Sequence, residues 1–113
     1  MNIDKAALGF NAVGSKHRLG VLLELVKVGK SGLTIGEIQE QLNIPASTLA
    51  YHLDFLKDAN LIYQERKGRS IFNYAKFDYI ELLGNYLLKK CCVDQEKKKE
   101  KDKHHEWSII KRN

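Results

Sequence analysis

TIGEIQEQLN (residues 34–43) and PASTLAYHLDFL (residues 45–56) are the two segments that decide the fold of this chain. Thr34 and Glu37 have the spacing of a capping box, which predicts that a helix begins at the first segment. Pro45 suits the first turn of a second helix, because its missing amide hydrogen would have no partner there. The two segments therefore predict two consecutive helices.

A tight turn can join these helices, since Asn43 tolerates a left-handed backbone better than any residue except glycine. Apolar residues recur at steps of three and four in both segments, which is the spacing of one helix face. The predicted inner positions are Ile35, Ile38 and Leu42 in the first helix and Leu49, Leu53 and Leu56 in the second.

The second helix would present small and polar side chains on the face opposite its leucines. Ser47, Ala50, Tyr51 and Asp54 point outward on a helical wheel, with Thr48 on the flank. Such a face fits a DNA major groove, which is about 12 Å wide. We expect Ser47, Thr48 and Tyr51 to reach base edges or phosphates. A phosphate would repel the carboxylate of Asp54, which we place outside the groove.

Two amphipathic helices are predicted ahead of these segments, over residues 3–13 and 16–28, and a loop with two glycines follows them. Gly14 can end the first helix, and Ser15 can cap the second. The expected apolar stripes are Ile3, Ala6, Ala7, Phe10 and Val13 in the first helix and Leu19, Leu22, Leu23 and Val26 in the second.

After Asn60 the pattern is typical of a β-hairpin. LIYQERK and SIFNYAKF favour strands, and Gly68 with Arg69 predicts a two-residue turn in which Gly68 has a positive φ. Arg66, Lys67 and Arg69 at the tip could contact an adjacent minor groove or the sugar-phosphate backbone. The alternative is that these residues form only a solvated turn. This is the weaker interpretation, because the hairpin follows the two predicted helices.

Residues 77–92 predict a fifth helix, with Ile80, Leu83, Tyr86 and Leu87 as its apolar band. Residues 94–106 are almost entirely charged or polar, which favours a frayed helical extension or disorder. We therefore divide the chain into a DNA-binding and dimerisation domain, residues 1–92, and a charged C-terminal tail, residues 93–113.

Composition is consistent with one small domain that binds a polyanion. The 113 residues are 43% hydrophobic, and 19 Lys and Arg against 14 Asp and Glu give a formal charge of +5. Neither a signal peptide nor a run of roughly 18 apolar residues is visible, so we expect a cytoplasmic protein without membrane association. An enzyme is disfavoured, because the sequence has no glycine-rich phosphate loop and no recognisable partners to activate a cysteine.

The first and fifth predicted helices both carry broad apolar faces that a core built from the other elements does not need. These faces predict a homodimer. A twofold dimer places two identical helices on successive turns of one DNA face, so its double-stranded operator should contain inverted repeats.

From about Ala7 to Cys92, this order of elements resembles the ArsR/SmtB family of dimeric winged-helix repressors. FNAVGSKHRLGVLLEL is similar to the opening motif of the family, and PASTLAYHLDFLKDANLI is similar to its recognition helix and the step into its wing. The resemblance implies a mainly α fold with a small β-hairpin, a winged helix-turn-helix that dimerises through its first and fifth helices. The matching positions are Phe10, Ala12, Val13, Gly14, Arg18, Leu19, Leu22, Ser47, Thr48, His52, Leu53, Leu56 and Leu61.

His52 borders the predicted buried face, so a packed or phosphate-contacting histidine is a better interpretation than a metal ligand. We include His52 with Ser47, Thr48, Tyr51, Arg66, Lys67 and Arg69 in the predicted DNA-binding set.

The family resemblance also implies repression that a metal ion, metalloid or other thiol-directed signal relieves. The sequence lacks the best-known site of the family, since TIGEIQ has no cysteine pair. The zinc pattern of the fifth helix is incomplete, because Tyr79 and Ile80 follow Asp78. Cys91 and Cys92 remain, at a place where some arsenic-responsive members carry adjacent cysteines.

Two adjacent thiolates can chelate a soft centre such as As(III) or Sb(III). Inorganic As(III) usually takes three sulfur ligands, so the third would come from an outside thiol or from the other subunit. Zn(II) is a weaker candidate, because it needs four ligands and would require His104 and His105 to fold back. We expect no obligatory cofactor. The alternatives are two packing cysteines, or a regulator without a metal inducer that is constitutive, redox-sensing or controlled by a partner.

Overall fold

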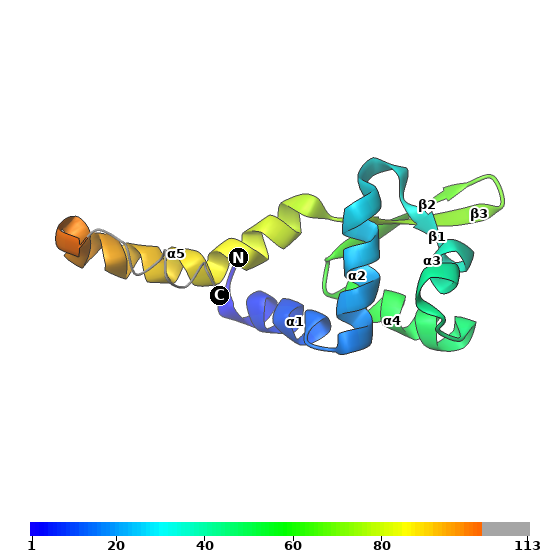
Figure 1. The fold of residues 1–113 in the computed structure, drawn as a ribbon, viewed down its shortest axis with the longest axis horizontal. Coiled ribbons are helices and arrows are strands. Elements are labelled where there is room, and N and C mark those ends of the chain that lie inside the picture. The colour runs from blue at the N-terminus through cyan, green and yellow to red at the C-terminus, as the bar shows by residue number, and fades with distance from the viewer. Residues whose placement is uncertain (103–113) are drawn as a thin grey trace. The chain divides into compact units, whose positions relative to one another are not determined.

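The computed structural model describes the backbone of residues 1–102 and the side chains of residues 1–89. Residues 1–83 form one compact unit, and the rest of the last helix belongs to a second unit. The elements, shown in Figure 1, are α1 (Ile3–Val13), α2 (Lys16–Val28), the 3-10 turn η1 (Gly29–Ser31), β1 (Leu33–Thr34), α3 (Ile35–Leu42), α4 (Ala46–Asp58), β2 (Ile62–Lys67), β3 (Ser70–Ala75) and α5 (Phe77–Asp102).

Local side-chain chemistry sets the helix boundaries as predicted. The Ser15 hydroxyl accepts a hydrogen bond from the Arg18 amide at 3.3 Å and begins α2. Thr34 and Glu37 form the complete capping box of α3, with bonds of 2.9 and 3.2 Å. Asn43 ends α3 in the left-handed conformation, with φ of 55°. Pro45 lies one position earlier than predicted, because it is the N-cap residue of α4 and the helix begins at Ala46.

The buried leucines of α4 confirm the helix-turn-helix pattern. Leu49, Leu53 and Leu56 are all buried, and α4 packs on α1, α2, α3 and β2. Ile38 of α3 is fully buried against the same core. Burial of these side chains stabilises the fold by roughly 1.5 to 3 kcal/mol for each residue.

The apolar stripe predicted for α2 is largely wrong. Of its members only Leu22 is buried, whereas Leu19 and Leu23 are 42% and 50% exposed. Val21 and Leu25 fill the core instead. Residues 19–26, LGVLLELV, are apolar at most positions, so periodicity alone does not select one face of this helix.

The buried face of α1 also differs from the predicted apolar stripe, of which only Ala6 is buried. Its buried residues are Ala6, Gly9 and Ala12, and Ile3 is 70% exposed. A Cβ atom added at Gly9 would lie only 2.9 Å from a methyl carbon of Leu83, so the helix approaches its neighbour through small residues. A search for large apolar side chains overlooks a helix face of this kind.

The sheet has three antiparallel strands in the order β1-β3-β2. The two-residue strand β1 was not predicted, whereas the hairpin and the positive φ of 66° at Gly68 were. Asn73, on the central strand, is almost completely buried. Its amide nitrogen donates to the Leu33 carbonyl at 3.1 Å, and its oxygen accepts from Gln64 at 2.7 Å, so one side chain joins all three strands.

The last helix, α5, continues to Asp102, beyond the predicted end near Cys92. The expectation for residues 94–102 was a frayed helix or disorder, and the structure has helix there. Leu83 is buried and Leu87 is exposed. Within residues 1–102, none of the helices combines the length and hydropathy that a membrane span requires.

Candidate nucleic-acid interface

The outer face of α4 carries the side chains predicted to contact DNA. Ser47, Thr48 and Ala50 are exposed, and Tyr51 is 59% exposed. The first turn of α4 is not capped by a side chain from the described part of the chain, which leaves its first backbone amides available. Such amides, at the positive end of the helix dipole, bind anions such as phosphate.

The hairpin tip carries the predicted cations. Arg66 and Lys67 end β2, Arg69 lies in the turn, and all three are exposed. The Lys67 ammonium lies 5.4 Å from the ring centroids of both Phe72 and Tyr74, a cation-π arrangement. The Tyr74 hydroxyl raises the pKa of Lys67 above its ordinary value.

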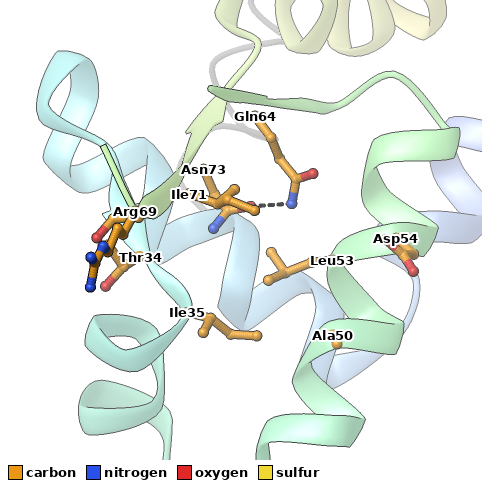
Figure 2. Close-up of a pocket in the computed structure, with 10 residues that line it drawn as sticks. Thr34, Ile35, Ala50, Leu53, Asp54, Gln64, Arg69, Ile71 and Asn73 are labelled. Carbon is orange, nitrogen blue, oxygen red and sulfur yellow. Dashed lines mark hydrogen bonds between the residues drawn. The ribbon is translucent and has the colours of Figure 1, made fainter. Parts of the chain in front are cut away.

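A cavity of about 380 Å³ lies between α4 and the hairpin (Figure 2). Its α4 side is formed by Ala50, Leu53 and Asp54, and Ile35 at the start of α3 forms the part of the wall opposite the hairpin. The hairpin contributes Gln64, Arg69, Ser70, Ile71 and Asn73, and Thr34 completes the lining. Of the outward-facing residues of α4, Ala50 and Asp54 thus share one cavity with Arg69, whereas Ser47, Thr48 and Tyr51 do not line it.

His52 is the member of the predicted DNA-binding set that the structure does not bring to the outer face. It is only 8% exposed, because it lies on the same helix face as the buried Leu49 and Leu56, three and four residues away. Its ring stacks on His17 with centroids 5.8 Å apart. Burial lowers the pKa of His52, and the positive charge of Arg18 and the nearby His17 lower it further. A neutral, packed histidine is the role that this geometry supports.

Arg18 is a residue that the sequence analysis named only as part of a motif. Its Nε donates to the Ala12 carbonyl at 2.7 Å, and its Nη2 donates to the Asn11 carbonyl at 3.2 Å. Its guanidinium carbon lies 3.8 Å from the ring centroid of Phe55. Arg18 follows Lys16 and His17 at the polar start of α2, so no local pattern marked it as a half-buried cation with partners in other elements.

A metal site is not formed by the side chains of residues 1–89, among which no group of three His, Cys, Asp or Glu residues could hold an ion. Asp78 lies exposed in the first turn of α5. The backbone of Cys91 and Cys92 is part of α5, but their side chains lie outside the described residues, as do His104 and His105.

Comparison with known proteins identifies relatives in sequence and in fold. The family model described as a helix-turn-helix domain matches residues 13–65. The chain is 33% identical over 88 residues to the arsenical resistance operon repressor of Bacillus subtilis, covering 78% of this chain and 80% of that protein. It is 36% identical over 79 residues to the transcriptional repressor SdpR of the same organism, covering 70% and 84%.

Among solved structures, the fold is similar to that of an ArsR-like transcriptional regulator from Rhodococcus sp. RHA1. The TM-score is 0.73 at 20% sequence identity, with 83% of this chain and 86% of that chain covered. This similarity shows that the arrangement of helices and hairpin is that of a winged helix-turn-helix.

Proposed function

This chain belongs to the ArsR family of winged helix-turn-helix transcriptional repressors, and we propose that it binds an inverted-repeat operator as a homodimer until a thiol-binding inducer releases it. The observation that carries the DNA-binding part is the outer face of α4. This face is exposed and small or polar, whereas the opposite face is fixed in the core by three leucines.

We assign α4 as the recognition helix. Its uncapped first turn would bind a DNA phosphate, and Ser47 and Thr48 would donate hydrogen bonds beside it. Tyr51, one turn later, would reach a base edge, and Ala50 would allow close approach to the groove. Arg66, Lys67 and Arg69 would contact the neighbouring backbone without reading sequence. Asp54 would lie beyond the bound part of the helix.

Exposed apolar side chains support the homodimer. Ile3 and Leu8 are exposed on α1, and Leu82, Leu87 and Leu88 are exposed on α5. Each of the two helices therefore leaves large apolar side chains exposed to solvent, which is typical of helices that pack against a partner. A twofold pair of recognition helices would then meet two half-sites about one helical turn apart, which requires inverted repeats in the operator.

Cys91 and Cys92 are the proposed inducer site. Adjacent thiolates bind As(III) or Sb(III) through two sulfur atoms, and an outside thiol or a cysteine of the second subunit would supply the third ligand. The similarity to an arsenical resistance operon repressor favours this inducer class over Zn(II). Inducer binding needs to change the DNA affinity of the dimer by only about 1 to 3 kcal/mol.

The test is a DNA-binding titration with the full chain and a fluorescent fragment of its own promoter. Wild-type protein should bind this fragment in preference to a scrambled one, and arsenite or antimonite should release it. The variants Cys91→Ser and Cys92→Ser should bind equally well but should not respond. The conservative serine keeps the size of the side chain and removes only the soft ligand.

Other outcomes discriminate between the parts of the proposal. Selective binding that ignores arsenite, antimonite and Zn(II) would leave a repressor without a metal inducer. In that case oxidant or a partner protein would be the next effector to test. An equal response of wild type and both serine variants would move the inducer site elsewhere. A wild-type protein with no preference for the promoter fragment would overturn the DNA-binding proposal.

A further inference from the structure

We propose that Arg18 is a positioning residue for operator recognition, which fixes the recognition helix α4 against the C-terminal end of α1. This inference rests on the proposed function, because it concerns how precisely α4 is presented to DNA. Arg18 itself lies at the start of α2 and is not a member of the predicted DNA-contacting set.

On one side, Arg18 binds the end of α1. The last carbonyls of a helix have no partner within the helix and carry the negative end of its dipole. Two of these carbonyls, from Asn11 and Ala12, accept hydrogen bonds from the guanidinium group. The last turn of α1 has no basic residue of its own, so Arg18 supplies the complementary charge from the next helix.

On the other side, Arg18 contacts α4 through Phe55. The guanidinium lies over the phenyl ring at 3.8 Å, a close cation-π and stacking contact. The ring of Phe55 in turn meets the ring of Tyr51 edge-on, with centroids 6.2 Å apart and planes at 75°. A continuous series of contacts therefore leads from the end of α1 to the tyrosine that we expect in the DNA groove.

The chemistry of this contact requires arginine. A guanidinium can donate to two carbonyls in its plane and stack on a ring with its face at the same time. A lysine ammonium keeps the charge but has neither the plane nor the fork. Because α1 also carries part of the proposed dimer surface, the position of α4 on α1 contributes to the separation of the two recognition helices. Loss of Arg18 should therefore reduce sequence preference more than general DNA affinity.

The test compares Arg18→Lys and Arg18→Gln with the matched control Lys16→Gln, which removes an exposed charge from the same turn of α2. Affinity is measured for the promoter fragment and for a scrambled fragment over a range of KCl concentrations, and the melting temperature is measured in parallel. Both Arg18 variants should lower the ratio of specific to non-specific affinity by about tenfold, as the loss of one base contact would. The salt dependence should remain that of the wild type.

Three results would overturn the inference while leaving the proposed function intact. If Arg18→Lys keeps the wild-type ratio of specific to non-specific affinity and Arg18→Gln lowers the salt slope by about one, Arg18 contacts a phosphate directly. If the melting temperature falls and the ratio does not change, the residue is only structural. If both Arg18 variants match Lys16→Gln, the contact is unimportant.

If Arg18→Gln does not fold, Phe55→Leu is the substitute variant. It removes the aromatic ring but keeps the hydrogen bonds from Arg18 to α1, and it must lower the same ratio of specific to non-specific affinity. A wild type without sequence preference would overturn the proposed function and this inference together.

Discussion

The imidazole ring of His52 in the recognition helix lies nearly parallel to that of His17 in α2, with centroids 5.8 Å apart and planes at 24°. Nδ1 of His52 is buried and has no hydrogen-bond partner among the described residues. Burial lowers the pKa of His52 first, and Arg18 and His17 add to the effect. Packing of this ring between α2 and α4 therefore favours its uncharged form.

Stability should decrease as the pH falls below the ordinary histidine value of 6.5. In the unfolded chain His52 binds its proton near that pH, whereas the folded chain resists protonation, so the unfolded state gains protons first. The loss grows as the pH falls through the window between 6.5 and the lower folded pKa, and then stops. Urea unfolding between pH 7.5 and 5 measures it. His52→Gln should be less dependent on pH over this range, and an unchanged slope would contradict the assignment.

Two glycine substitutions should have opposite effects. Gly32 has φ of +63°, and a Cβ there would lie 2.5 Å from a ring carbon of Tyr74. Gly32→Ala should lower the free energy of unfolding by roughly 2 to 4 kcal/mol through backbone strain and overpacking. Gly20, within α2, has nothing within 4 Å of the added carbon. Gly20→Ala should raise stability by up to about 1 kcal/mol. Urea denaturation of both variants tests this, and a similar loss in both would be inconsistent with it.

Thr34→Ala should destabilise the start of α3. The substitution leaves the Glu37 amide without its cap and weakens the reciprocal bond to the Thr34 backbone. The expected cost is about 1 kcal/mol in the free energy of unfolding. Gln41→Ala, at an exposed position of the same helix, is the control and should change stability by less than about 0.5 kcal/mol. Equal effects in the two variants would exclude the capping box as the cause.

Single substitutions at the hairpin tip should reduce the salt dependence of DNA binding. Arg66→Gln or Arg69→Gln removes one cation next to the DNA backbone, so the slope of log affinity against log salt should fall by about one. Preference for the promoter fragment should persist. Titrations at several KCl concentrations measure both quantities. Lys5→Gln on α1 serves as the comparison, and the same decrease there would indicate a non-local charge effect.

Tyr51→Ala should weaken binding to the promoter fragment by about tenfold, with little change for a scrambled fragment, if the side chain reads a base. Tyr51→Phe separates the hydroxyl from the ring, since only a hydrogen bond to the base would be lost. Fluorescence titrations of the three proteins decide the matter. Unchanged affinity in the alanine variant would remove Tyr51 from the recognition surface.

Helix ends and the helix-turn-helix were predictable because short-range chemistry determines them. The capping box at Thr34, the left-handed Asn43 and the leucine spacing of α4 all depend on residues within a few positions of one another. The faces of α1 and α2 were not predictable in the same way. Their buried sides depend on which neighbours approach, and α1 uses glycine and alanine where a pattern search expects larger side chains.

In the candidate site, too, the features set by nearby residues were predictable and those set by distant residues were not. The exposed positions of Ser47, Thr48 and Tyr51 follow from one helical wheel, and the structure confirms their exposure. The two-residue strand β1 pairs with β3, which is distant in sequence. The contacts of Arg18 have no local sequence pattern. Both features could be found only from the folded structure. The inducer role of Cys91 and Cys92 stays a prediction.

The strand order has a consequence for solubility. Because β3 is central, β2 is an open edge of the sheet, and its backbone groups could pair with a strand from another molecule. The opposite edge, β1, is only two residues long and offers little to pair with. Glu65, Arg66 and Lys67 place three consecutive charges on the open edge, which is how natural sheets resist aggregation. The basic tip that we propose approaches DNA thus also keeps separate molecules from joining their sheets.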